Sequence, residues 1–536
     1  MKKYILPTLT VFGVALGIFI GAMLAQKANA QRIVYQNGRW SLEQSKVDRL
    51  LQLMETAYVD SLDLDSITDE VMSELVQKLD PHSSYIPKED LELVSSELAG
   101  SFSGIGVQFS IQQDTIGIIA VIAGGPCEGV GVLAGDKIIT VDDSLFVGKK
   151  INNEKVMRTL RGEKGTKVKL GIKRSGTPDL LYFTITRGDI PVTSVDAKFI
   201  IERNGKKIGF VRVNKFGENT YREFISALAE LKAQGATSYI IDLRENSGGY
   251  MDQAIRMANE FLNRNDLIVY AEGRAYPRYE AKADGGGRFK DAKLAVLIDD
   301  FSASASEIFA GAMQDNDRAQ IIGRRSFGKG LVQQQMPFSD GSAVRLTIAR
   351  YYTPSGRCIQ KPYSLGDQAD YQQELLDRYE HGEFFSADSV HFADTTTYRT
   401  KKGRIVRGGG GIMPDVFVGR DTTLNTPWFN RCVNLAYTYQ FAYKYTNDHR
   451  KQLSQYKDWK ALESYLLKQN ILNEFVAFAK AKGVEPNEAE IQKSKPLMVR
   501  LLNAYIVRNI LGDEGFFPLF ERDDEITKKA VKELSK

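Results

Sequence analysis

The period of the hydrophobic and polar positions changes along the chain, and each change marks a different kind of segment. Residues 41–98 carry apolar side chains at helical spacing, such as Val47 and Leu51, which predicts amphipathic helices. Between residues 101 and 188, short alternating runs of apolar and charged residues are separated by glycines, which predicts half-buried strands joined by tight turns. These patterns indicate a helical N-terminal segment over 41–98 and a small β-rich domain over 99–189.

Residues 190–435 alternate between strand-like and helix-like patterns, which is typical of an α/β layer built on a sheet. Strand patterns at 208–213, 238–243 and 294–298 are separated by amphipathic helical patterns at 221–234, 252–262 and 304–314. Residues 366–410 interrupt this alternation with a polar segment rich in Asp, Thr and Gly, which predicts a surface excursion. Residues 436–536 are rich in aromatic residues, Lys and Glu, which predicts a helical C-terminal domain.

The first 30 residues have the pattern of an export signal. Three residues, Met1-Lys2-Lys3, precede an apolar run over 4–24 and a small-x-small site at 28–30, as in a cleaved secretory signal. The run is also long enough for a membrane-spanning helix, since about 20 apolar residues suffice. A cleaved signal and an uncleaved inner-membrane anchor both remain open. Either one places residues 31–536 in a periplasmic or other extracytoplasmic space.

The composition excludes several classes of protein. Hydrophobic residues make up 43% and charged residues 26% of the 536 residues, as in a globular chain and unlike a disordered regulator or a collagen. Lys and Arg number 71 and Asp and Glu 67, a formal net charge of +4, so no basic footprint predicts nucleic-acid binding. The 3 cysteines lie far apart and the 4 histidines have no ligand spacing. We therefore expect no disulfide framework, no metal and no other cofactor.

Two glycine-rich stretches begin like nucleotide-binding motifs but fail at deciding positions. The stretch 323–330 lacks the final hydroxyl of a P-loop, because Gly330 takes its place. The stretch 104–107, Gly-Ile-Gly-Val, opens like a dinucleotide fingerprint, but Phe109 replaces the third glycine and a strand follows. It fits either an ordinary β-hairpin turn or a backbone-amide loop that holds a peptide's terminal carboxylate while the strand 107–111 pairs with the peptide.

A third glycine-rich turn and a serine cluster each follow a predicted strand. The turn 242–249 ends in two glycines, which can free backbone N–H groups to face an oxyanion, although a plain strand-to-helix connection is the alternative. Strand 294–298 runs into the sequence Ser-Ala-Ser-Ala-Ser-Glu at 302–307. Ser304 and Glu307 have the spacing of a helix-capping box. A serine at a helix N-terminus is also where a nucleophile would lie.

A nucleophilic serine needs a base, and no histidine lies near Ser304 in the sequence. Lys329 lies in an uncharged apolar stretch, 327–332, where burial would favour its neutral form. Three neighbours are candidates for the apolar pocket around it: Phe327, Leu331 and Val332. Two arginines would add repulsion if they lay close to it: Arg324 and Arg325. A Ser304–Lys329 dyad is therefore a hypothesis, with His82 as the alternative base.

Together these motifs resemble those of the tail-specific, or C-terminal processing, serine peptidases. The resemblance covers residues from about 45 to about 420 and is carried, in the family's order, by the stretches 79–85, 242–249, 301–307, 327–333, 352–357 and 411–415. It implies an α+β fold. A PDZ domain, 99–189, would lie beside a crotonase-like ββα protease core, 190–435, with helical segments at both ends.

The same resemblance implies roles for individual residues. Ser304 would be the nucleophile, Lys329 the general base, and Gln333 the residue that orients the lysine. The oxyanion amides would come from Gly248 or Gly249 and from Ala305. The PDZ loop for the peptide carboxylate would be Gly104, Ile105, Gly106 and Val107. Ser247 departs from the family pattern, because a proline is common at that position.

Two classes of function follow from these residues. The favoured one is a serine endopeptidase that recognises C-terminal tails of exported proteins through its PDZ domain and cleaves upstream. The alternative is a non-catalytic PDZ scaffold or an apolar-ligand binder on the same core. The expected partners are protein or peptide substrates with free C-termini, and the membrane is contacted only through the N-terminal segment. An adaptor protein and a homo-oligomer remain open.

Overall fold

The computed structural model describes residues 33–36, 39–42, 46–96, 98–112, 114–122, 124–174, 176–392 and 394–536. The predicted signal or anchor over residues 1–30 lies outside these ranges. Within them, no helix is both long enough and apolar enough to cross a bilayer. The chain divides into two compact units, Met1–Leu75 and Val76–Lys536.

The first unit contains a short hairpin followed by helices. Strand β1 (Ile33–Gln36) pairs antiparallel with β2 (Arg39–Leu42). Helix α2 (Lys46–Ala57) and helix α3 (Leu64–Gln77), which runs across the unit boundary, come next. The apolar spacing in this part of the sequence therefore does correspond to helices.

The centre of the second unit is a six-stranded sheet with the order β12-β13-β14-β17-β18-β23. Its strands are β12 (Val195–Arg203), β13 (Lys206–Val213), β14 (Ser238–Asp242), β17 (Lys293–Ile298), β18 (Gln320–Gly323) and β23 (Val416–Phe417). The pair β12–β13 is antiparallel, and the other neighbours are parallel. Parallel strands are buried on both faces, and accordingly every residue of β14 and all but the first residue of β17 are buried.

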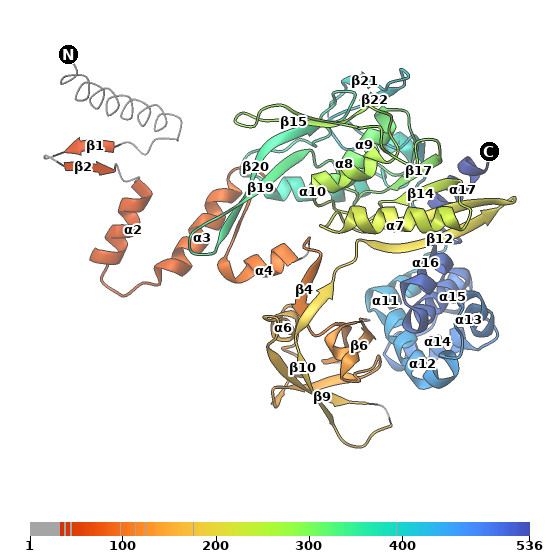
Figure 1. The fold of residues 1–536 in the computed structure, drawn as a ribbon. Helices are drawn as coiled ribbons and strands as arrows, with labels where there is room; N and C mark the ends of the chain where they lie inside the picture. The colour runs from red at the N-terminus through yellow and green to blue at the C-terminus, as the bar shows by residue number, and fades with distance from the viewer. Residues whose placement is uncertain are drawn as a thin grey trace, which may run out of the picture. The chain divides into compact units, whose positions relative to one another are not determined.

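Helices cover both faces of this sheet (Figure 1). Helices α7 (Thr220–Ala233), α8 (Met251–Asn259) and α9 (Ala305–Asp315) share a core with one face. Helix α17 (Glu525–Ser535) packs on the other face, where Val531 and Leu534 share a core with Phe210 and Leu297. The last helix of the chain is therefore part of the core of the central sheet.

A second sheet has the order β16-β15-β20-β19, and β3 pairs with β20. Its strands are β3 (Ser84–Ile86), β15 (Leu267–Glu272), β16 (Tyr279–Lys282), β19 (Leu331–Pro337) and β20 (Ala343–Tyr352). Helix α4 (Lys88–Ser96) follows β3. The pairing of β3 with β20 brings the 79–85 stretch beside the strands that follow Lys329.

The prediction of a surface excursion over residues 366–410 is wrong for part of that segment. It contains helix α10 (Gln368–Glu380), the 3-10 helix η1 (Ala387–Ser389) and a hairpin of β21 (Thr397–Arg399) and β22 (Ile405–Arg407). Arg378 and Glu383 are buried, and Arg378 donates to the carbonyl oxygens of Arg325 and Ser326 at 2.9 and 3.1 Å. The segment therefore braces the loop that leads to Lys329.

The small β-rich domain has the strand order β10-β9-β7-β6-β5, with β8 paired to β7. Its elements are β5 (Val107–Gln112), β6 (Thr115–Val121), α5 (Pro126–Gly129), β7 (Lys137–Val141), β8 (Ser144–Leu145), α6 (Asn153–Leu160), β9 (Lys167–Lys173) and β10 (Leu181–Thr186). Strand β5 lies at one edge of this sheet, so it can accept a further strand. Strands β4 (Ser101–Gly104) and β11 (Gly188–Pro191) pair at the two ends of the domain.

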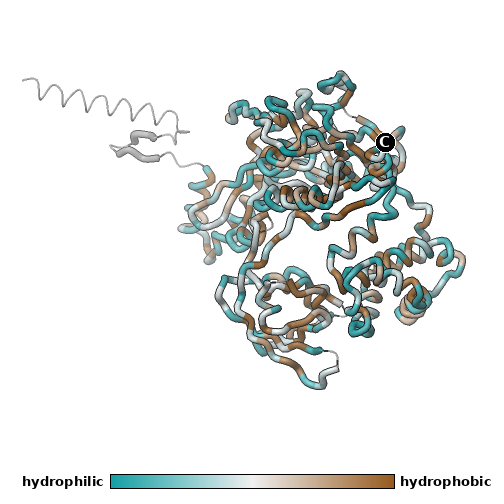
Figure 2. The backbone as a smooth tube through the Cα atoms, turned by 45° about the vertical axis from the view of Figure 1, so that its right-hand side comes forward, coloured by the Kyte–Doolittle hydropathy of each residue, from teal (hydrophilic) through white to brown (hydrophobic). Residues whose placement is uncertain are grey.

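The C-terminal part consists of helices α11 (Pro427–Asn434), α12 (Tyr437–Leu453), α13 (Trp459–Leu466), α14 (Ile471–Ala481), α15 (Glu488–Leu511) and α16 (Asp513–Glu521), followed by α17. They enclose a core of their own that includes Phe441, Phe475 and Leu502. Figure 2 shows hydrophobic stretches along the elements inside these domains and hydrophilic stretches in the surrounding loops.

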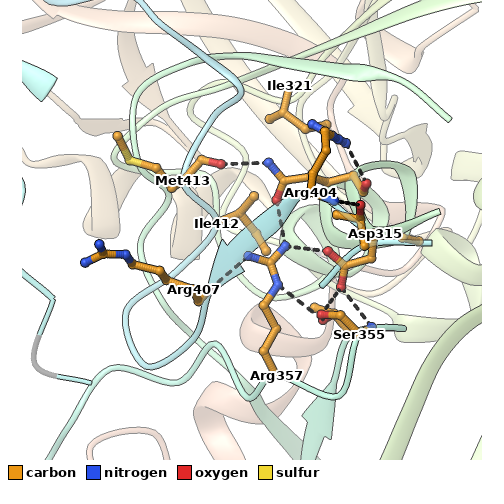
Figure 3. A network of polar contacts seen from close by, with 12 residues as sticks. Asp315, Ile321, Ser355, Arg357, Arg404, Arg407, Ile412 and Met413 are labelled. Carbon is orange, nitrogen blue, oxygen red and sulfur yellow. Dashed lines mark hydrogen bonds and ion pairs between the residues drawn. The ribbon is translucent and has the colours of Figure 1, made fainter. Parts of the chain in front are cut away.

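Two of the family-like stretches meet at the C-terminal end of α9 (Figure 3). The fully buried Arg357 donates to Asp315 at 2.7 Å and to the Gln314 side chain at 2.6 Å. Arg404 bonds both Asp415 and the Gln314 carbonyl oxygen. The stretches 352–357 and 411–415 thus fix the far end of the helix that begins after Ser304, which is a structural role.

Candidate active site

The predicted nucleophile and base line the same cleft, which has a volume of about 460 Å³. Ser304, Lys329 and Gln333 lie in its wall, together with the two glycines of the 242–249 turn. The apolar part of the wall comes from Val94, Leu98, Met251, Ile308, Leu331 and Val332. Residues far apart in the sequence are therefore brought together as the resemblance implies.

Ser304 occupies a strained turn between β17 and α9. Its backbone has φ 55° and ψ −113°, a left-handed conformation that is costly for a residue with a Cβ. Such strain at a strand-to-helix turn is the arrangement of a nucleophile elbow, which pushes the side chain away from the sheet. Ser304 is partly exposed and faces the cleft, whereas a serine that only caps a helix needs no left-handed backbone.

The two serines that flank Ser304 have a different part in the site. Ser302 and Ser306 are buried, and their hydroxyls donate to the carbonyl oxygens of Leu243 and Asn246, each at 2.8 Å. Both bonds join the serine turn to the 242–249 turn. The alternating serines are therefore two cross-links around one residue that is open to the cleft.

The two glycines of the 242–249 turn differ in whether their amides have a hydrogen-bond acceptor. The Gly248 N–H donates to the Asn246 side chain at 2.9 Å, and the Gly248 carbonyl oxygen accepts from Phe216 at 2.9 Å. Among the described residues the Gly249 N–H has no acceptor, and the Ala305 N–H begins α9, where no intrahelical acceptor exists. Of the two predicted glycines, Gly249 is therefore the one whose N–H is free to donate to an oxyanion together with the N–H of Ala305.

Gly248 is required by space as well as by conformation. Its φ is 106°, and a Cβ at this position would lie 2.7 Å from the Cβ of Ser304. A side chain at 248 would therefore push the serine turn away from the 242–249 turn.

Charged residues hold the back of the 242–249 turn. The buried Arg244 donates to Asp242 at 2.8 Å, to Glu521 at 2.7 Å and to Asp524 at 2.9 Å. Glu521 ends α16, and Asp524 caps α17. The C-terminal helices thus contact the turn that carries the predicted oxyanion amides.

Lys329 is mostly buried, and its ammonium donates to Gln333 Oε1 at 2.9 Å. Gln333 follows a bulge in the β19–β20 ladder, and its amide donates to the carbonyl oxygen of His82. Burial and then the nearby Arg345 guanidinium lower the pKa of Lys329, against the opposing charges of Glu307 and Asp80. The site therefore favours the neutral lysine more than water does.

Arg324 and Arg325, which would repel Lys329 only if they lay close to it, are not the cations that lower its pKa. Arg324 pairs with Asp300 at 2.7 Å, and Arg325 pairs with Glu383 at 2.6 Å. Both arginines are neutralised by buried carboxylates, and the repelling cation is Arg345 on β20.

The predicted apolar pocket of Lys329 is only partly correct. Leu331 and Val332 line the cleft. The Phe327 ring is not part of the cleft wall and lies instead 4.3 Å from the Lys361 ammonium and 5.9 Å from the Tyr371 ring.

Glu307 connects the serine turn to the lysine loop, a role that the capping pattern did not predict. Its buried carboxylate accepts from the backbone N–H groups of Ser304 at 2.8 Å, Gly328 at 2.8 Å and Lys329 at 2.9 Å. A fourth donor is the Ser326 hydroxyl, at 2.5 Å. Burial raises the pKa of Glu307 to about 7, against these four hydrogen bonds, which favour the ionised form.

Tyr351 is a second residue whose role was not predicted. Its buried hydroxyl lies 3.0 Å from the Ser304 carbonyl oxygen and also contacts the Lys329 carbonyl oxygen. It therefore ties together the backbones of both predicted catalytic residues. No local sequence signal identifies it, since the contact depends on how β20 crosses the cleft.

The stretch 79–85 supports Gln333 rather than supplying a base. Asp80 accepts from the Ser83 hydroxyl at 2.6 Å and from Thr347 on β20 at 3.0 Å, which fixes the turn whose carbonyl holds Gln333. His82 Nε2 lies 2.9 Å from the Tyr371 hydroxyl and does not line the cleft. Burial and then the Lys329 charge lower the pKa of His82 to about 4.

The predicted carboxylate loop, residues 104–107, lies in the β-rich domain. Ile105 is buried in that domain's core, and the carbonyl oxygens of Ile105 and Gly106 accept from Cys127 and Ile122 at 3.0 Å each. Gly106 has φ 78°, and a Cβ there would come within 3.3 Å of Gly125 and Pro126. The loop leads directly into the edge strand β5, which begins at Val107.

The described residues contain no group of three His, Cys, Asp or Glu side chains placed to hold a metal ion. The three cysteines are free thiols.

Comparison with known proteins identifies the family. The model of peptidase family S41 matches residues 207–371, and a PDZ-domain model matches residues 103–185. A carboxy-terminal-processing protease from Bartonella bacilliformis is 36% identical over 359 residues, which are 65% of this chain and 80% of that protein. The chain belongs to peptidase family S41. It is a carboxy-terminal processing serine protease with a PDZ domain.

The comparisons also find further similar proteins. A carboxyl-terminal-processing protease from Picosynechococcus is 33% identical over 63% of this chain and 78% of that protein. Among solved structures, the photosystem II D1 C-terminal processing protease is 24% identical and covers 71% of this chain and 88% of that chain, with a TM-score of 0.37. Residues 428–512 match a family of unknown function.

These findings confirm the predicted family and the predicted combination of a PDZ domain, a mixed α/β protease core and a helical C-terminal region. They favour the enzyme over the binding-only alternative. The roles of individual residues come from the geometry and are proposals.

Proposed function

We propose that this S41 protease is an endopeptidase that uses a Ser304–Lys329 dyad, captures C-terminal tails of exported proteins through its PDZ domain and cleaves upstream of them. The observation that carries the proposal is the shared cleft. A serine on a strained elbow opens into it beside a lysine that burial drives towards its neutral form. This combination supplies a nucleophile and a base without a histidine.

The reaction follows from these atoms. Neutral Lys329 takes the proton of the Ser304 hydroxyl while Oγ attacks the carbonyl carbon of the scissile bond. The negative oxygen is stabilised by the N–H groups of Gly249 and Ala305. The amine leaves with the proton from Lys329. A water molecule then attacks the ester and gives a proton to Lys329, which returns it to Ser304 Oγ as the bond between Oγ and the acyl carbon breaks. Gln333 holds the lysine's Nζ in the orientation that this requires.

Substrate capture is assigned to the PDZ domain. Strand β5 lies at an edge of its sheet, where a peptide can add as a further strand, and the loop 104–107 would bind the terminal carboxylate through backbone amides. The pattern of residues 1–30 supports a location outside the cytoplasm, with 4–24 as a cleaved signal or an inner-membrane anchor. The substrates would therefore be exported proteins.

Labelling with an active-site phosphonate tests the nucleophile. We expect one adduct, mapped by peptide mass spectrometry to Ser304, and loss of both label and cleavage in Ser304→Ala. Ser247→Ala is the matched control, because Ser247 lines the same cleft without being the proposed nucleophile. Label on Ser247, or cleavage by a folded Ser304→Ala protein, would show that the dyad is misassigned.

Amidation of the substrate's C-terminus tests recognition by the PDZ domain. Removing the terminal charge should lower kcat/KM for a long tail by about tenfold, because a charge-assisted set of hydrogen bonds is lost. Peptides too short to reach the PDZ domain should hardly change. Equal kcat/KM for the acid and amide forms of a long substrate would rule out this mode of capture.

A further inference from the structure

The cleft around Ser304 is lined by basic residues and by no acidic residue among those described. None of the described residues that line it is Asp or Glu. Its two basic residues are Lys329 and Arg345. The proposed function needs Lys329 in its neutral form. In that state the charged group of the cleft wall is the guanidinium of Arg345.

Arg345 has no acidic partner. Opposite it in the β19–β20 ladder stands Gln335, whose Oε1 accepts from Arg345 Nη2 at 3.1 Å. Among the described residues this is the only hydrogen bond of the Arg345 side chain, and no carboxylate lies within ion-pair distance of it. An arginine carries five N–H donors, so most of the donors of Arg345 remain available to a molecule in the cleft.

The buried arginines of the described chain all have an acidic partner. Each pairs with a carboxylate at 2.6–3.0 Å: Arg212, Arg244, Arg324, Arg325, Arg357 and Arg378. Arg345 is partly buried and would lose more water when a peptide fills the cleft. A desolvated guanidinium without a counter-charge is unfavourable, so the peptide is the natural source of the missing carboxylate.

We propose that Arg345 is a specificity-determining residue that selects substrates with a Glu or Asp side chain close to the scissile bond. The proposal rests on the dyad proposed above, because the cleft is the substrate site only if Ser304 is the nucleophile. A guanidinium and a carboxylate form a bidentate, charge-assisted pair. The apolar wall beside Arg345 can accommodate a neighbouring apolar side chain. The cleft would therefore bind substrates that carry an acidic and an apolar side chain close together.

The same pairing has a consequence for the base. Arg345 repels the Lys329 ammonium, whereas the carboxylates of Glu307 and Asp80 attract it. His82, whose pKa is about 4, is neutral at the pH of the assay. A substrate carboxylate on Arg345 would cancel part of the repulsion and so favour the protonated lysine. Acidic substrates should therefore show a lower KM, together with a kcat whose basic limb lies at higher pH.

The experiment uses short peptides that do not reach the PDZ domain, each made with an amidated and with a free C-terminus. Glu or its neutral isostere Gln is placed at each of the positions flanking the scissile bond, and kcat and KM are measured for the full-length enzyme. We expect one position at which Glu lowers KM by about tenfold relative to Gln. That ratio should fall to about one in Arg345→Gln, persist in part in Arg345→Lys, and reverse in favour of Gln in Arg345→Glu.

Arg350→Gln is the matched control, because Arg350 lies on the same strand and does not line the cleft. It should keep the preference for Glu. Equal KM values for Glu and Gln at every position, or a preference that survives in Arg345→Gln, would overturn the proposal. A preference that appears only with a free C-terminus would assign Arg345 to the terminal carboxylate and would overturn the side-chain assignment.

Phosphonate labelling of the same samples separates this proposal from the proposed dyad. Label on Ser304 with equal KM values for Glu and Gln overturns the specificity and leaves the dyad standing. Absence of label on Ser304 in active wild-type enzyme overturns the dyad itself. Circular dichroism of each Arg345 variant identifies any loss of KM discrimination that comes from misfolding.

Discussion

A Lys329→Arg variant is expected to fold normally and to lose at least about a thousandfold in kcat/KM, because arginine stays protonated at any pH that the protein tolerates. At the ordinary lysine pKa of about 10.4, fewer than one side chain in about 1,000 is neutral at pH 7. Burial lowers that pKa in Lys329. The neutral base therefore becomes available at lower pH, and wild-type activity should rise with pH along one basic limb whose midpoint lies below the ordinary lysine pKa.

The measurement is kcat/KM of wild type, Lys329→Arg and Lys329→Ala across pH 6–10, with and without EDTA, which should have no effect. Lys361→Arg is the matched control: this buried lysine pairs with Glu374 at 2.8 Å and does not line the cleft. It should keep most of the activity. Cleavage by folded Lys329→Arg at near the wild-type rate would disprove the dyad.

Elements whose burial follows a simple period could be predicted from the sequence. The strand expected at 294–298 is β17 (Lys293–Ile298), and the helix expected at 304–314 is α9 (Ala305–Asp315). The boundaries of both elements follow from the local sequence. The apolar run ends where the chain leaves the sheet, and the helix begins directly after the turn at Ser304. Ser304 and Lys329 could be predicted for the same reason, because each differs in chemistry from the residues next to it in the sequence.

Pairings across the fold could not be predicted in this way. Composition reads the polar segment 366–410 as exposed, but Arg378 and Glu383 are buried as partners of each other, at 2.8 Å, and of the Arg325 loop. The same limitation made Arg325 a candidate for repelling Lys329, although Glu383 neutralises it. The effect of a charged residue on a site depends on its ion-pair partners, and those partners come from distant segments of the chain.

Glu307 is the clearest case of a function hidden behind a local pattern. Its spacing from Ser304 predicts a capping interaction, and the Ser304 N–H does donate to it. The donors from Ser326, Gly328 and Lys329 come from a loop about 20 residues further along the chain, and no helix signal contains them. Glu307 therefore both caps the helix and connects the backbone of the nucleophile to the loop that carries the base.

A Glu307→Gln variant is expected to lose about 2–5 kcal/mol of unfolding free energy and to be labelled at Ser304 at least about a hundredfold more slowly. Each carboxylate oxygen of Glu307 accepts two hydrogen bonds: Oε1 from Ser326 and Gly328, and Oε2 from Ser304 and Lys329. The glutamine NH₂ group must replace one of these oxygens, so in either orientation it faces donors with a donor. Relief of that conflict would pull the serine turn away from the lysine loop.

Glu223→Gln is the control that isolates this effect. Glu223 also accepts two backbone N–H groups, from Ser194 at 2.7 Å and Val195 at 3.1 Å, but both bind the single oxygen Oε2. A glutamine there can keep both bonds on its oxygen and turn its NH₂ group away, so stability should fall by less than about 1 kcal/mol and labelling should not change. Urea unfolding gives the first quantity, and the rate of phosphonate modification gives the second. Equal urea midpoints and equal labelling rates for Glu307→Gln and wild type would show that the four donors do not hold the site together.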